Sequence, residues 1–179
     1  MLQHFDPVRF YTEIIYSLFI LASFLFIYFR TKDLYAITGH KGIEYFRTAI
    51  LFFALAYASR LAYHLARVLL RYMEHGFSGR PLSTLSLIMI TYLITVAIGY
   101  LIYSNLWKSL KHRHFLIYIN VFAAMIMIVF MLSNSLLFLI SVQLYLIAII
   151  LLINRQKKIK YLYALISSFW ILNMIIFYL

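Results

Sequence analysis

Four basic residues in one apolar segment are the part of this sequence best suited to chemistry. Arg60, His64, Arg67 and Arg71 follow one another at spacings of three and four residues, so they lie on one face of a helix. Ionisable groups at membrane depth are costly, and they usually pair with another group, face the bundle interior or bind a ligand. This basic stripe is therefore the first candidate site.

Depth separates the members of the stripe. If Arg71 lies at the outer interface, Arg60 is about 16 Å deeper, at 1.5 Å of rise per residue. Arg67 and Arg71 can extend to the lipid headgroups, whereas Arg60 requires a carboxylate, several carbonyls or a ligand. The chain has five acidic residues, and Glu13, near the outer end of the first apolar segment, is the best placed of them.

Three interpretations of the stripe follow. A structural pair would join Glu13 to Arg60 or to His64. A polar pocket in the outer leaflet would bind an anionic or polar ligand, or a lipid headgroup. A voltage-sensing role would require arginines at every third position, which the stripe lacks. The ligand or ion-pair candidates are thus Arg60, His64, Glu13 and Arg67.

Signatures of cofactors and catalysis are missing from the sequence. No second histidine is expected at the depth of His64, so bis-histidine haem ligation is not indicated. Cysteine is absent, which excludes thiolate metal sites and a cysteine nucleophile. We find no zinc-protease motif, nucleophile elbow or phosphate-binding glycine loop. The sequence predicts no cofactor, no metal and no catalytic residue.

The composition indicates an integral membrane protein. Hydrophobic residues make up 65% of the chain and charged residues 12%, and a soluble domain of this size could not bury that much apolar surface. A membrane-spanning helix needs about 20 apolar residues. Six stretches qualify: 8–29, 45–72, 82–107, 115–132, 134–153 and 160–179. The expected fold is an all-α polytopic bundle, with six spans arranged as three helical hairpins in a single domain of residues 1–179, and no cleavable signal peptide.

Basic residues mark the links that should face the cytoplasm. They gather in the first, third and fifth links: Arg30, Lys32, Lys41 and Arg47; Lys108, Lys111 and Arg113; Arg155, Lys157, Lys158 and Lys160. The positive-inside rule then places both termini outside, in what we expect to be a prokaryotic cell membrane. The formal net charge of +11 is interpreted as topology and contact with anionic lipid, not as nucleic-acid binding.

Small and neutral polar residues predict how the helices pack. Ala54, Ala58, Ala62 and Ala66 recur at every fourth position, opposite the basic stripe, and such a ridge lets helices approach closely in lipid. A helix used on both sides should be central to the bundle. Neutral polar groups such as Thr91 and Thr95 are candidates for hydrogen bonds between helices.

The leading functional hypothesis is a small non-catalytic multi-pass membrane protein. It would be a sensor module or a subunit of a larger membrane assembly, with a protein partner or a second copy of itself. Six plain helices with basic turns resemble, in outline, the membrane modules of prokaryotic sensor proteins. The alternative is a small transporter or channel with an outer-leaflet anion or polar-ligand site around Arg60 and His64.

The topology leads to a labelling prediction. The chain has no cysteine, so a Ser109→Cys variant carries a single thiol in the third link. An impermeant thiol reagent should not label this variant in sealed cells, but should label it after permeabilisation. Labelling from outside would reverse the predicted orientation.

Overall fold

Four helices make up nearly all of the described chain. The computed structural model describes residues 7–72, 80–108 and 114–133, with separate positions at 141, 142, 144, 145, 148 and 168. The helices are α1 (Pro7–Thr38), α2 (Lys41–Tyr72), α3 (Arg80–Leu106) and α4 (Phe115–Ser133). These ranges contain no strand.

Each of the four helices is long and apolar enough to cross a membrane. The candidate spans are Phe10–Thr38, Lys41–Leu70, Thr84–Leu106 and Phe115–Ser133. The all-helical prediction is confirmed for these residues, and the four helices indicate an integral membrane protein. The described residues support four spans, not six. Two of the predicted spans lie outside the described helices: the fifth, 134–153, and the sixth, 160–179. The hairpin that they would form lies outside them too.

The link between α1 and α2 is much shorter than the sequence predicted. Gly39 has a positive φ of 59°, a conformation that glycine adopts without steric cost, and its N–H donates to the carbonyl of Tyr35 at 2.8 Å. This geometry ends α1, and α2 begins two residues later. The predicted loop 30–44 was therefore wrong, because most of it continues the two helices and places its basic residues on helical faces.

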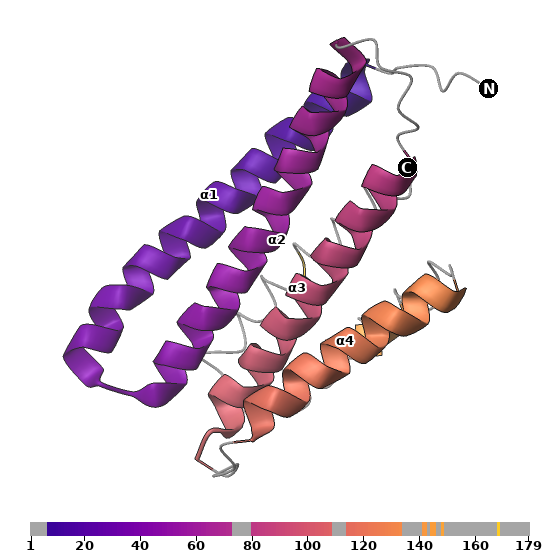
Figure 1. Ribbon diagram of the computed structural model, residues 1–179. Coiled ribbons are helices and arrows are strands. Elements are labelled where there is room, and N and C mark those ends of the chain that lie inside the picture. Colours follow the sequence, from indigo (N-terminus) through magenta and orange to yellow (C-terminus); the bar gives the residue numbers. More distant parts are fainter. Residues whose placement is uncertain are drawn as a thin grey trace.

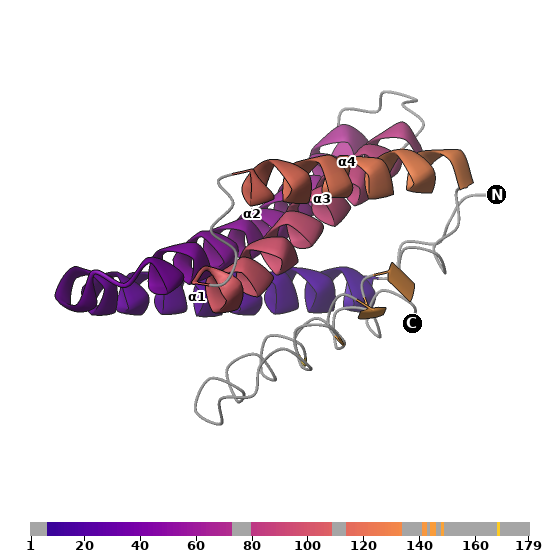
Figure 2. The same ribbon diagram turned by 90° about the horizontal axis from the view of Figure 1, so that it is seen from below.

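The central helix is α2, as the two-sided pattern predicted. It packs against α1 on one side and α3 on the other, while α4 packs on α3. Figure 1 shows α1, α2 and α3 running alongside one another, with α4 crossing beside α3. Figure 2, turned by 90°, places α1 and α4 on different sides of the α2–α3 pair.

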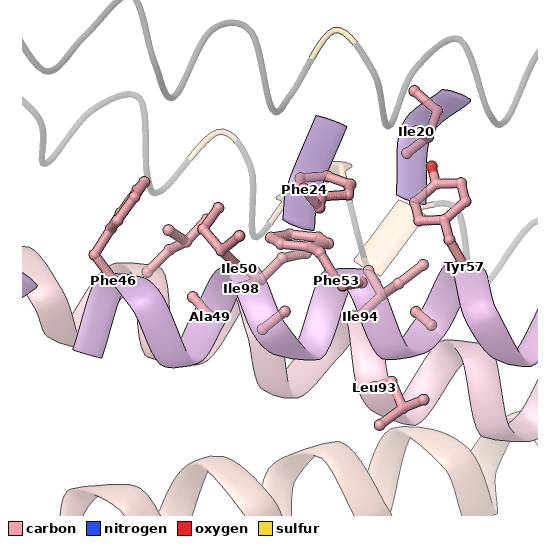
Figure 3. Packing of buried hydrophobic residues seen from close by; sticks show 14 residues of the cluster. Ile20, Phe24, Phe46, Ala49, Ile50, Phe53, Tyr57, Leu93, Ile94 and Ile98 are labelled. Carbon is pink, nitrogen blue, oxygen red and sulfur yellow. The ribbon is translucent and has the colours of Figure 1, made fainter. Parts of the chain in front are cut away.

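Aromatic and branched side chains fill the core between α1, α2 and α3. The rings of Phe24 and Phe53 stack with their centroids 5.2 Å apart, and Phe24 also contacts Tyr57 at 5.8 Å. Figure 3 shows these rings with Ile20 of α1 above α2, and Ile94 and Ile98 of α3 beside them. Burial of this cluster positions α1 against the part of α2 that carries Arg60 and His64.

The alanine ridge does not pack along its whole length. Ala54 is buried at 3% exposure, Ala58 and Ala66 are half-buried, and Ala62 is exposed. The inner end of the ridge is thus a packing surface, whereas Ala62 is not covered. The ridge hypothesis was wrong at this position, because no neighbouring helix covers Ala62 in the described structure.

Hydrogen bonding between α3 and α4 uses residues that the sequence analysis did not select. The hydroxyl of Tyr92 donates to Oδ1 of Asn120 at 2.9 Å. Thr91 and Thr95 instead donate to carbonyls one turn earlier in α3, Leu87 and Thr91 respectively, at 2.7 and 2.8 Å. Threonine hydroxyls inside helices commonly donate a hydrogen bond to a backbone carbonyl of their own helix. The prediction that these two threonines bond to another helix was therefore wrong.

The first and third links lie at the same end of the bundle. The ring of His40 contacts that of Trp107 at 5.0 Å. A Cβ atom on Gly42 would approach the carbonyl oxygen of Ser104 and Nε1 of Trp107 to 2.9 Å, so the start of α2 abuts the end of α3. This arrangement fits the predicted grouping of basic links on one side. Which side is cytoplasmic stays a prediction.

Two substitutions on the alanine ridge test the packing. Ala54→Leu should destabilise the bundle by about 1–3 kcal/mol, because added methyl groups overpack a buried contact. Ala62→Leu adds the same side chain at an exposed position and should change the stability by less than about 0.5 kcal/mol. Thermal unfolding in detergent measures both. Equal losses for the two variants would mean that the outer part of the ridge is also covered.

Candidate functional site

One face of α1 lies against the half of α2 that carries the basic stripe. Glu13, Ser17, Ile20 and Phe24 are spaced by four, three and four residues, which places them on the same side of α1. Ser17 and Ile20 are fully buried there. The two helices are antiparallel neighbours, so residues toward the start of α1 lie opposite residues toward the end of α2.

His64 and Glu13 meet across this contact. Nε2 of His64 lies 3.4 Å from Oε2 of Glu13, and the Glu13 side chain is 14% exposed. The ring of His64 is bordered by Tyr63 at 5.4 Å and by Phe10 of α1 at 6.3 Å. Neither ring nitrogen has an aligned hydrogen bond. The contact is therefore a close electrostatic one inside a largely aromatic setting.

Arg60 lies one helical turn before His64 on α2 and is also buried. Its exposure is 6%, and that of His64 is 4%. The rings of Tyr16 and Tyr57 contact each other at 6.5 Å across the same helix interface. A buried guanidinium is strongly destabilising unless other groups compensate its charge. Glu13 of α1 supplies a negative charge at this interface, beside His64, which lies one turn from Arg60 on α2.

The structure brings together three of the four predicted site residues. Glu13, Arg60 and His64 share the α1–α2 contact, whereas Arg67 is exposed. One of the two pairings that the sequence left open, Glu13 with His64, is a close contact in the structure. Arg71 lies on α2, and its side chain is outside the described part of the structure.

Two features of the α1–α2 interface escaped the sequence analysis. Ser17 is fully buried, and its Oγ has no hydrogen-bond partner. Its position one turn after Glu13 was the available signal. Arg47 was assigned to a loop, but it lies on α2, with its guanidinium carbon 4.9 Å from the ring centroid of Tyr28 and 5.8 Å from that of Tyr35. The seven-residue spacing of these tyrosines would have placed both on one face of α1.

The Glu13–Arg60–His64 cluster has limited chemical options. Within residues 7–72, 80–108 and 114–133, no group of three histidine, aspartate or glutamate side chains is placed to hold a metal ion. The cluster combines one carboxylate, one guanidinium and one imidazole between two tightly packed helices. Such a group can hold α1 against α2, because the carboxylate and the two basic side chains attract one another across the contact.

The buried charges lead to a stability prediction. Glu13→Ala should destabilise the bundle by about 3–5 kcal/mol, because removing one partner strands the other buried charge. Adding Arg60→Ala to Glu13→Ala should recover part of that loss. Arg67→Ala, on the exposed part of the stripe, should cost less than about 0.5 kcal/mol. Unfolding in detergent measures all four chains. A double variant no more stable than Glu13→Ala, or a large loss in Arg67→Ala, would contradict the assignment.

Comparison with known proteins identifies an archaeal relative. This relative is an uncharacterized protein of Archaeoglobus fulgidus, 31% identical over 175 residues, which cover 90% of this chain and 77% of the relative. No family model matches the chain, and no solved structure matches it. Because of this identity and the coverage of both sequences, the chain belongs to the same family as this archaeal protein.

Proposed function

We propose that the protein is a non-catalytic multi-pass membrane module that acts as a sensor or as a subunit of a larger membrane assembly. The observation that carries this proposal is the burial of Arg60 and His64 within the α1–α2 contact, beside Glu13. The buried members of the stripe, Arg60 and His64, help to join two helices. A change in their protonation or ligation would alter the fit of α1 against the rest of the bundle.

Burial also weighs against the alternative of a transporter or channel. A substrate site must be reachable by the substrate, and an anion moving past Arg60 would need access to its guanidinium. Arg60 and His64 are instead closed off by the packing of α1 on α2. The exposed Arg67 and the partly exposed Glu13 side chain are the features that keep an outer-leaflet anion site as the second candidate.

The outward faces of the bundle suit lipid and partner helices. Large apolar side chains are exposed on α4, including Ile117, Val121, Phe122, Met125, Ile128 and Leu132. In a bilayer, such a surface contacts acyl chains or other membrane helices. A module of this kind acts through contacts with a partner protein or with a second copy of itself. We propose that it lies in a prokaryotic cell membrane with both termini outside.

Reconstitution separates the two candidate functions. In proteoliposomes, the protein should give no chloride or phosphate flux above that of protein-free vesicles, and Arg60→Gln should leave this unchanged. Purified in a mild detergent, it should migrate as a complex larger than one chain. Flux that is lost in Arg60→Gln and kept in Arg67→Gln would support the transporter instead. A monomeric chain without partners would contradict the subunit proposal.

A further inference from the structure

Arg47 is another cation of α2, and its guanidinium contacts aromatic rings of α1. It is half-buried, and its guanidinium rests on the rings of Tyr28 and Tyr35. Its Nε is buried without a hydrogen-bond partner. The neighbouring acid, Glu44, instead accepts a hydrogen bond from the hydroxyl of Tyr35 at 3.1 Å. Aromatic rings hold the cation in place but do not neutralise it.

The position of Arg47 corresponds to the boundary of the hydrocarbon layer. The twelve residues between Arg47 and Arg60, 48–59, carry no charge. As a helix, they span about 18 Å. The hydrocarbon core is about 30 Å thick. If Arg71 lies at the outer interface, Arg47, 24 residues earlier on α2, is about 36 Å away along the helix axis, so it reaches the headgroups at the other surface, where phosphate groups lie.

The end of the α1–α2 hairpin that carries Arg47 combines net positive charge with exposed apolar surface. Arg30, Lys32 and Lys41 are exposed at this end, and with Arg47 they outnumber its two exposed acids, Asp33 and Glu44. Phe29 and Ile37 of α1 are exposed as well, at 61% and 83%. An acidic protein segment would match the charges but not these apolar side chains. An anionic phospholipid matches both, since its phosphate can meet the cations while its acyl chains cover the apolar residues.

We propose that Arg47, held between Tyr28 and Tyr35, is the centre of a binding site for the phosphate of an anionic phospholipid. A guanidinium stacked on aromatic rings keeps its N–H edge free, and that planar edge donates well to phosphate oxygens. The site lies at the opposite end of α2 from Glu13 and His64. The proposal depends on the membrane placement of the protein and not on the role proposed for the Glu13–Arg60–His64 cluster.

Native mass spectrometry of the detergent-solubilised protein tests the site. With phosphatidylglycerol and phosphatidylcholine added at equal concentration, the protein should retain phosphatidylglycerol preferentially. Arg47→Gln should weaken this retention about tenfold, as expected for the loss of a charge-assisted hydrogen bond. Arg30→Gln removes the same charge from an exposed position and should have a clearly smaller effect. Arg47→Lys, which keeps the charge but not the planar edge, should fall between them and also serves if Arg47→Gln does not fold.

Other results of these experiments would show either that Arg47 forms no specific site or that the site binds a ligand other than lipid. Equal retention of the two lipids, or equal losses in Arg47→Gln and Arg30→Gln, would show that only diffuse charge attraction operates. Inorganic phosphate at millimolar concentration should not displace the lipid. Displacement that depends on Arg47 would assign the site to a soluble phosphate. Arg47-dependent capture of an acidic peptide in place of lipid would assign it to a protein partner. Each of these results would overturn the lipid proposal.

Discussion

The cost of placing the charges of α2 in a bilayer is the constraint on which the rest of the fold depends. Between Arg47 and Arg60, the helix offers only twelve uncharged residues, or about 18 Å, against a hydrocarbon thickness of about 30 Å. At least one of these arginines must therefore lie inside the apolar layer. Lipid cannot compensate a guanidinium there, so other helices must provide the compensation.

The first helix, α1, contacts the cations of α2 toward both of its ends. Toward its start, it places Glu13 against His64, one turn from the buried Arg60. Toward its end, it places the rings of Tyr28 and Tyr35 against Arg47. The two arrangements use different chemistry, a carboxylate in one and aromatic faces in the other. Both hold α1 alongside α2, and together with the packing of α3 they make α2 the central helix.

Composition and apolar patterning were sufficient to predict the helices, because a long apolar run in a membrane has few stable alternatives. The grouping of Glu13 with His64 was also accessible, since Glu13 was the acidic residue expected at the right depth. The length of the α1–α2 link could not be predicted from the sequence. Charged residues from Arg30 to Arg47 suggested a loop, but tertiary contacts such as Tyr35–Glu44 continue the helices through them. The exposure of Ala62 depends on how the helices cross, which a repeat of alanines does not encode.

The most direct test of the account is the distance between Glu13 and His64 in a lipid bilayer. Solid-state NMR on the protein in lipid, with the histidine ring labelled with nitrogen-15 and the glutamate carboxyl with carbon-13, measures this distance. A strong correlation is expected between Nε2 of His64 and the carboxyl carbon of Glu13, one of whose oxygens lies 3.4 Å from that nitrogen. The correlation should disappear in Glu13→Gln. A spectrum in which the His64 ring shows no carboxyl neighbour, in a sample whose Phe24–Phe53 contact is intact, would contradict it.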